Sequence, residues 1–228
     1  MKNKIKIFLS FFLVLCLLFV SSCGQKDNPP QKKEEPREFS ESEVRDAFLR
    51  LLPLSVKVNE IFYGYGIPTD KSDTAVTYGN YRSADPAYLS ENGIESTESL
   101  REAAHLVYTE GMCRVIFHKL EVMYDGDSII GYKRYYDIPA TATEPYRLMV
   151  DTKATVYLKD TVVYDTASLT VTGADGAYVC ATIRATVTNA DGKSQDKILN
   201  LRLFEEANGW RLDTMTYTSY SEYTSEQK

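Results

Sequence analysis

The sequence predicts an α+β domain over residues 40–228, in which N-terminal helices pack on one face of an antiparallel sheet. Three observations support this fold class. Apolar residues recur at helical spacing up to about residue 121, and from about Tyr146 the period changes to two. Glycine-containing turns typical of hairpins then separate the β-rich segments. A length of about 190 residues is ordinary for a single domain.

The first helix is predicted from about Glu41 to Phe62. Ser40 and Glu43 form a capping box before it, in which each side chain would satisfy a free backbone N–H. The apolar stripe of this helix consists of Val44, Ala47, Phe48, Leu51 and Leu52. Pro53 is expected to kink or interrupt the helix, because proline lacks the N–H and its ring clashes with the preceding turn.

A helical pair is predicted at residues 97–121, after a stretch at residues 69–95 that reads as loop with one short strand. Thr109 is a plausible N-cap for the second helix of the pair. The chain's two histidines, His105 and His118, fall outside the apolar stripes and are expected on the solvated surface. The inward residues are expected to be Leu100, Ala103, Ala104, Val107, Met112, Cys113, Ile116 and Leu120.

The C-terminal part predicts an antiparallel meander of about four strands. Ala154, Val156 and Leu158 alternate with polar residues, Leu169 and Val171 continue the alternation, and residues 179–188 and 198–204 are longer β-rich runs. Asp-Gly and Asn-Gly dipeptides mark the turns, and residues 210–217 form the last strand. Trp210 is predicted to pack between the sheet and the helices, and the last ten or so residues to form a loose tail.

Residues 1–22 predict an export signal. Three lysines precede an apolar run over residues 7–20, which is shorter than the roughly 20 residues of a transmembrane helix. The run ends in Val20-Ser21-Ser22-Cys23, which resembles the lipobox of bacterial lipoproteins, in which the cysteine is lipidated. The alternative is an ordinary signal peptide with an incidental cysteine. Lipidation of Cys23 would tether the chain to the outside of the bacterial cell membrane.

The tether would continue into a flexible spacer. Residues 23–39 hold the lipidated cysteine and a polar stretch that cannot bury a core. The signal peptide contains three of the 26 basic residues and no acidic residue. The rest of the chain therefore has 23 basic and 32 acidic residues, which gives a formal net charge of −9. This charge argues against nucleic acid as a partner, because phosphate contacts need a basic face.

Motifs for metals and catalysis are absent from the sequence. Two histidines thirteen residues apart cannot form a zinc motif, and Asp125-Gly126-Asp127 lacks the later ligands of a calcium loop. No nucleophile elbow and no glycine-rich phosphate loop occurs. Cys113 and Cys180 could form a disulfide or remain two buried free thiols. We therefore predict no metal, cofactor or catalytic residue.

The order of elements resembles the NTF2-like superfamily, in which a curved, cystatin-like sheet wraps around helices. The resemblance covers about residues 40–218 and rests on the long first helix, the pair at 97–121 and the final hairpin around Gly209-Trp210. Residues 60–70, the tyrosine-rich loop after them and the Ser-Thr-Glu-Ser helix start are also similar to domains of Gram-positive surface lipoproteins. The resemblance implies a curved sheet and a cone-shaped pocket. It does not identify a function, because the superfamily includes both enzymes and binding domains.

Two functions remain open. The favoured one is a membrane-tethered extracytoplasmic module that binds an envelope protein or a cell-wall component. Tyrosine suits recognition, and an aromatic cluster lies in chain with few regular-structure signals. Its members, which form the candidate recognition surface, are Phe62, Tyr63, Tyr65, Tyr78 and Tyr81. The alternative is a small-molecule enzyme with isomerase- or dehydratase-type acid–base chemistry, which a deep pocket with a buried carboxylate would favour.

Overall fold

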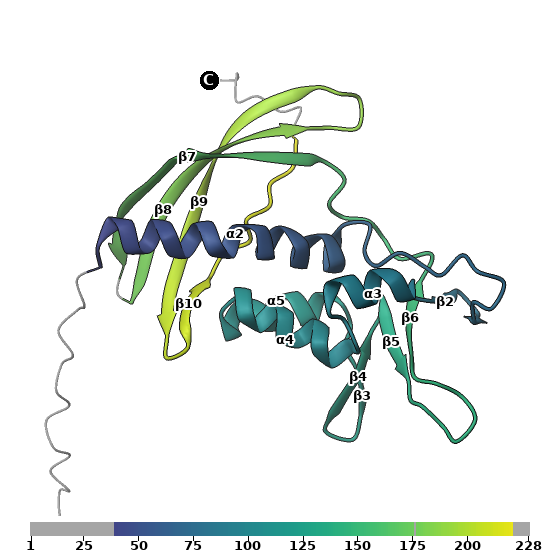
Figure 1. Ribbon diagram of the computed structural model, residues 1–228. Helices are drawn as coiled ribbons and strands as arrows, with labels where there is room; N and C mark the ends of the chain where they lie inside the picture. The colour runs from purple at the N-terminus through teal and green to yellow at the C-terminus, as the bar shows by residue number, and fades with distance from the viewer. Residues whose placement is uncertain (1–38, 176, 221–228) are drawn as a thin grey trace, which may run out of the picture. The chain divides into compact units, whose positions relative to one another are not determined.

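The computed structural model describes residues 39–175 and 177–220, which form helices and two antiparallel sheets (Figure 1). The predicted signal peptide, Cys23 and nearly all of the spacer lie outside these residues. The helices are α2 (Glu41–Tyr63), α3 (Pro86–Asn92), α4 (Thr97–Val107) and α5 (Glu110–Lys119). The α+β class is confirmed, but the prediction of one sheet is wrong, because residues 77–151 build a second sheet.

The first sheet has six strands in the order β1-β2-β6-β5-β4-β3. It is made of short antiparallel pairings. Two of its strands lie in residues 69–95, which were predicted to be loop with one short strand, and the other four lie at residues 123–151, where no strand was predicted before about residue 146. Asp125-Gly126-Asp127, which lacks the later ligands of a calcium loop, lies at the hairpin turn that joins the first two strands after α5. The strands are β1 (Thr77–Tyr78), β2 (Tyr81–Ser83), β3 (Met123–Asp125), β4 (Ser128–Tyr132), β5 (Tyr135–Ile138) and β6 (Arg147–Asp151).

The second sheet is the predicted four-stranded meander, in the order β10-β9-β8-β7. One face of its central strand is buried through Val179, Ala181, Ile183, Ala185 and Val187, as a period of two requires. The buried Trp210 packs edge-on against Phe39 with ring centroids 4.9 Å apart, and its strand contacts α2 and α4. The strands are β7 (Thr161–Asp175), β8 (Tyr178–Thr188), β9 (Ser194–Glu206) and β10 (Gly209–Leu212).

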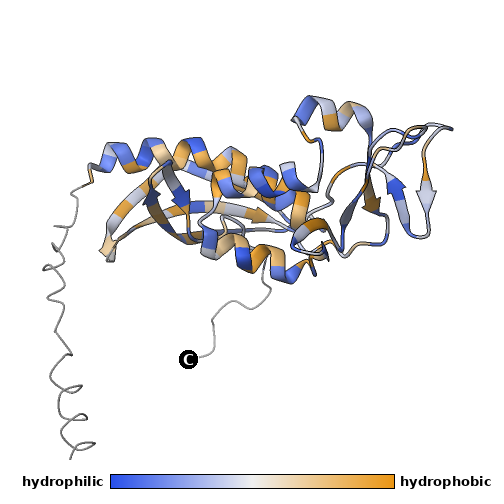
Figure 2. Ribbon diagram, turned by 90° about the horizontal axis from the view of Figure 1, so that it is seen from below, coloured by the Kyte–Doolittle hydropathy of each residue, from blue (hydrophilic) through white to orange (hydrophobic). Residues whose placement is uncertain are grey.

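Helix α2 connects the two halves of the fold. It contacts β7, β10 and α4, while α4 in turn contacts β4 and β5 of the first sheet. Hydrophilic and hydrophobic residues follow one another in bands along α2 in Figure 2, as expected for a helix with one buried face. Ser40 Oγ accepts the Glu43 N–H at 3.1 Å, which confirms the Ser40 half of the predicted capping box. Pro53 does not end the helix, contrary to one of the two expected effects. The proline is exposed, and the buried residues before and after it continue the same apolar face, whose packing favours one continuous helix.

Residues 69–95 are more ordered than predicted. They contain β1, β2 and the short helix α3, which starts at an Asp85 cap that accepts the Ala87 N–H at 2.9 Å. Pro86 follows at the first helical position, and Gly93 ends the helix with a φ of 61°. An aspartate, a proline and a later glycine at these positions are the ordinary signals of a short helix.

The predicted strand around Ala154, Val156 and Leu158 does not form. The N–H groups of Tyr157 and Leu158 instead both donate to Tyr63 O, at 2.8 and 2.9 Å. This segment therefore runs along the end of α2, and its alternation reflects packing on the helix rather than pairing in a sheet.

Both cysteines of the domain are free thiols, so the disulfide alternative is wrong. Cys113 is buried in α5, where desolvation raises the pKa of its thiol to about 12. Cys180 is half-buried and lies on the face of β8 opposite the core residues Val179 and Ala181. The alternation of the strand therefore turns this thiol away from the helices.

Tyrosine burial predicts a loss of stability at alkaline pH. Desolvation is the largest cause that raises the pKa of Tyr63 and of Tyr164 from 10.0 to about 12. Between these values the folded state keeps protons that the unfolded chain has lost, so the stabilisation is present below pH 10 and disappears as the pH rises towards 12. Urea unfolding measured across this range should show a falling free energy of unfolding. A shallower fall is expected for Tyr164→Phe, and a free energy that does not change with pH would contradict the assignment.

Candidate functional site

The space between α2 and the first sheet is filled by aromatic rings. Phe62 packs against Tyr132 with ring centroids 5.4 Å apart, and Phe117 packs against the same tyrosine at 5.3 Å. Tyr135 completes the group and is fully buried. Among the residues that the structure describes, no carboxylate is buried. The deep pocket with a buried acid that the enzyme alternative requires is therefore not found in this part of the chain.

The predicted recognition cluster does not form one surface. Phe62 and Tyr63 are core residues, because α2 extends through both positions and its period turns them inward. Tyr81 is half-buried, and its hydroxyl donates to Lys133 O at 2.6 Å. Tyr65 and Tyr78 are the exposed members, each with 73% of its surface accessible.

Tyr65 lines a surface hollow of about 270 Å³, which we call the tyrosine hollow. Its other aromatic walls are Tyr164 of β7 and Tyr217 of the C-terminal segment. Glu60 near the end of α2 and Asp160 just before β7 supply two carboxylates. Three separate parts of the sequence thus meet at this hollow.

Hydrogen bonds hold the walls of the tyrosine hollow in place. The Tyr65 N–H donates to Glu60 Oε1 at 2.7 Å, and the Asp160 N–H donates to the Tyr217 hydroxyl at 3.3 Å. The Tyr164 hydroxyl donates to Thr216 O at 2.7 Å. Because these side chains are already ordered, binding of a ligand would cost less conformational entropy of the protein.

The chemistry of this hollow is that of recognition. Burial raises the pKa of Tyr164 to about 12 and also raises the pKa of Tyr217, so both hydroxyls are neutral hydrogen-bonding groups at physiological pH. Tyrosine offers a large apolar face with a polar tip, and the carboxylates of Glu60 and Asp160 accept hydrogen bonds. Lys159 also lines the hollow, so the combination suits hydroxyl-rich ligands that both donate and accept hydrogen bonds.

Tyr164 and Tyr217 were not among the site residues predicted from the sequence. In the described part of the predicted tail, the Tyr220 N–H donates to Asp160 Oδ2 at 2.7 Å, so the tail is not loose there. Just before it, the buried Thr216 hydroxyl lies 2.8 Å from Ser55 Oγ and accepts from Asn59 Nδ2 at 3.1 Å. Two polar residues four positions apart on the buried face of α2 were the available signal, since buried polar groups need partners. Residues 221–228 of the predicted tail lie outside the described chain.

A second hollow, of about 420 Å³, is lined by both histidines. His105 is half-buried rather than fully solvated, and its Nδ1 lies 3.4 Å from Glu110 Oε2. The same carboxylate pairs with Arg114 Nε at 3.1 Å through its other oxygen. An imidazole beside a carboxylate can transfer protons. Water can reach both members of this pair, however, and no buried acid lies among the described residues to act with it.

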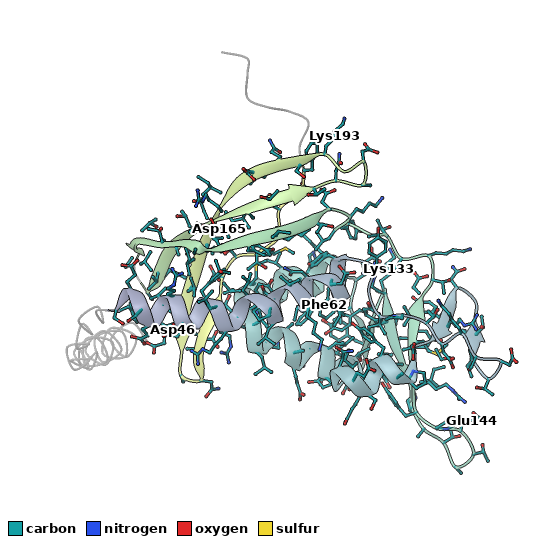
Figure 3. The ribbon with its side chains drawn as sticks, turned by 45° about the horizontal axis from the view of Figure 1, so that its top comes forward. Asp46, Phe62, Lys133, Glu144, Asp165 and Lys193 are labelled. Carbon is teal, nitrogen blue, oxygen red and sulfur yellow. The ribbon has the colours of Figure 1, made fainter. Side chains whose placement is uncertain are left out.

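A third hollow, of about 140 Å³, is rich in basic side chains, and we call it the basic hollow. Lys119, Lys133, Lys153 and Arg134 line it together with Glu121 and Asp151. Figure 3 labels two of its lining residues, Phe62 at the end of α2 and Lys133 in the turn between β4 and β5. Residues 154–158 separate this hollow from the tyrosine hollow, because Tyr157 lines one and Leu158 lines the other.

No metal site or membrane span is found in residues 39–220. No group of three histidine, cysteine or acidic side chains is arranged there to hold an ion. None of the helices described combines the length and the apolar composition needed to cross a membrane.

Comparison with known proteins gives no relative from which a function could be transferred. No family model, no curated protein and no solved structure matches this chain. The geometry of its hollows is therefore the basis for any functional assignment.

Proposed function

We propose that this chain is a membrane-tethered extracytoplasmic binding module with an NTF2-like fold, and that the tyrosine hollow is its recognition site. The observation that carries the proposal is the convergence of Tyr65, Tyr164 and Tyr217 on one hollow beside two carboxylates. The export signal and the Cys23 motif supply the location, and residues 24–38 the spacer that would hold the domain away from the membrane.

Binding fits the arrangement better than catalysis. The centre of the domain is packed with aromatic rings, which leaves the tyrosine hollow at the surface, where a large partner can reach it. The partner is an envelope protein or a cell-wall component, because these are the macromolecules within reach of a tethered domain outside the cell. The aromatic rings would give contact area at low rotamer cost, and the carboxylates would provide specificity.

An acid–base enzyme is the second candidate, and one observation favours it. His105 and Glu110 form a histidine–carboxylate pair that lines the 420 Å³ hollow. The pair ranks below the tyrosine hollow because its carboxylate is also engaged by Arg114 and because both partners are accessible to water. Water competes with a substrate for such groups and weakens their electrostatic effect.

The test of the proposed site concerns Tyr65, the most exposed of its three tyrosines. Tyr65→Ala should weaken capture of purified peptidoglycan or of a defined envelope protein by at least about fivefold, the scale of one lost aromatic anchor. Its melting temperature should not move, because the side chain is 73% exposed.

Tyr78→Ala is the matched control. Tyr78 has the same exposed fraction but lies on β1 and lines none of the hollows discussed above. Capture should survive in this variant. Equal loss in both variants, or loss in neither, would show that the tyrosine hollow is not the recognition site.

A separate prediction concerns the tether. Cys23→Ala removes the thiol that would carry the acyl chains, so the protein should leave the membrane fraction or accumulate with its signal peptide attached. Mass spectrometry of the wild-type protein should show acyl chains on an N-terminal Cys23. An N-terminus at another residue, or an unmodified cysteine, would contradict the lipoprotein assignment.

A further inference from the structure

We propose that the basic hollow is a second binding site, specific for a small phosphate-bearing anion. The site lies at the carbonyl ends of α2 and α5, where four basic side chains from three segments line a space of about 140 Å³. It is distinct from the tyrosine hollow and would function whether or not that hollow binds a partner.

The charge of the hollow is opposite to that of the whole protein. The chain has a formal net charge of −6, yet the side chains lining this hollow include four cations and only two anions. The carbonyl ends of two helices offset about half a charge each, which still leaves a positive excess. A local excess of this sign in an acidic protein attracts small anions.

Two of the three lysines that line the hollow have no partner within the described part of the fold. Lys133 pairs with Glu121 at 3.0 Å. Lys119 and Lys153, by contrast, make no side-chain hydrogen bond or ion pair with any of the residues the structure describes. Two free ammonium groups, one from the end of α5 and one from the segment after β6, remain available to a ligand.

Arg134 makes the floor of the hollow rigid. It is 95% buried and donates through Nη1 to Ile61 O and Gly64 O, at 3.1 and 2.9 Å, and through Nη2 to Thr155 O at 2.8 Å. All three acceptors are neutral carbonyls, and no carboxylate among the described residues forms an ion pair with this guanidinium. Its charge is thus held in place without a counterion.

Phosphate fits this arrangement better than a carboxylate does. Carboxylates are best recognised by the two-pronged face of an arginine, but carbonyl oxygens already occupy the terminal nitrogens of Arg134. Lysines act as point charges and can approach the oxygens of a tetrahedral group from different directions. The ligand class is therefore a phosphate dianion, either as the free ion or at the end of an ester.

Equilibrium dialysis of the detergent-solubilised protein tests the site with inorganic phosphate, glycerol phosphate and acetate. Phosphate should bind saturably at one site per chain, and acetate about tenfold more weakly. The double variant Lys119→Ala, Lys153→Ala should bind phosphate about tenfold more weakly than the wild type, and added sodium chloride should weaken binding by the wild type. The control Lys71→Ala removes an exposed lysine that lines none of these hollows and should leave binding unchanged.

The ester arm identifies the source of the phosphate. Tighter binding of glycerol phosphate than of inorganic phosphate assigns an ester, and equal binding assigns the free ion; both support the site. Absence of saturable phosphate binding, or equal loss in the double variant and in Lys71→Ala, would overturn it. Because both lysines are exposed, the double variant should keep the wild-type melting temperature, and a large drop would itself contradict their free state.

Discussion

The attachment of the end of α2 to the turn between β4 and β5 is the constraint on which the rest of the structure depends. Ile61 O accepts from Arg134 Nη1 at 3.1 Å and from the Tyr135 hydroxyl at 2.6 Å, and that hydroxyl in turn accepts the Ile67 N–H at 3.1 Å. Gly66 makes the close approach possible, because its φ is +80° and a Cβ there would lie 2.5 Å from the Tyr135 hydroxyl oxygen. A buried guanidinium and a buried phenol would be costly without these partners.

Both proposed sites follow from this attachment. Arg134 forms the floor of the basic hollow and also donates to Thr155 O, while the Tyr157 and Leu158 N–H groups donate to Tyr63 O. The segment held in this way is the wall between the two hollows. The loop after the attached end of α2 contains Tyr65, which lines the tyrosine hollow. Since α2 also packs on β7 and β10, one polar cluster orients elements of both sheets.

Periodic patterns predicted the long elements, whereas contacts distant in sequence decided the rest. The first helix, the helical pair and the C-terminal meander follow from spacing, and Trp210 is buried as expected. The strands of the first sheet are short, so their alternation carries little signal. Of the aromatic candidates, Tyr65 does line a hollow. Phe62 is buried instead, because α2 continues through this position and turns its ring towards the core. Tyr164 and Tyr217 could not be paired from the sequence, because only the folded chain brings β7 beside the C-terminal segment.

Hydrogen exchange of Tyr135→Phe tests the central role of the attachment most directly. The substitution keeps the buried ring and removes the hydroxyl that bonds Ile61 and Ile67, so the free energy of unfolding should fall by about 1–3 kcal/mol. Amide exchange should accelerate at residues 61–67 and 154–158, with strands β8 and β9 less affected. Tyr136→Phe, which alters a half-buried neighbour, is the control and should leave these amides protected. Unchanged exchange at residues 61–67 in Tyr135→Phe, or the same acceleration in both variants, would contradict the account.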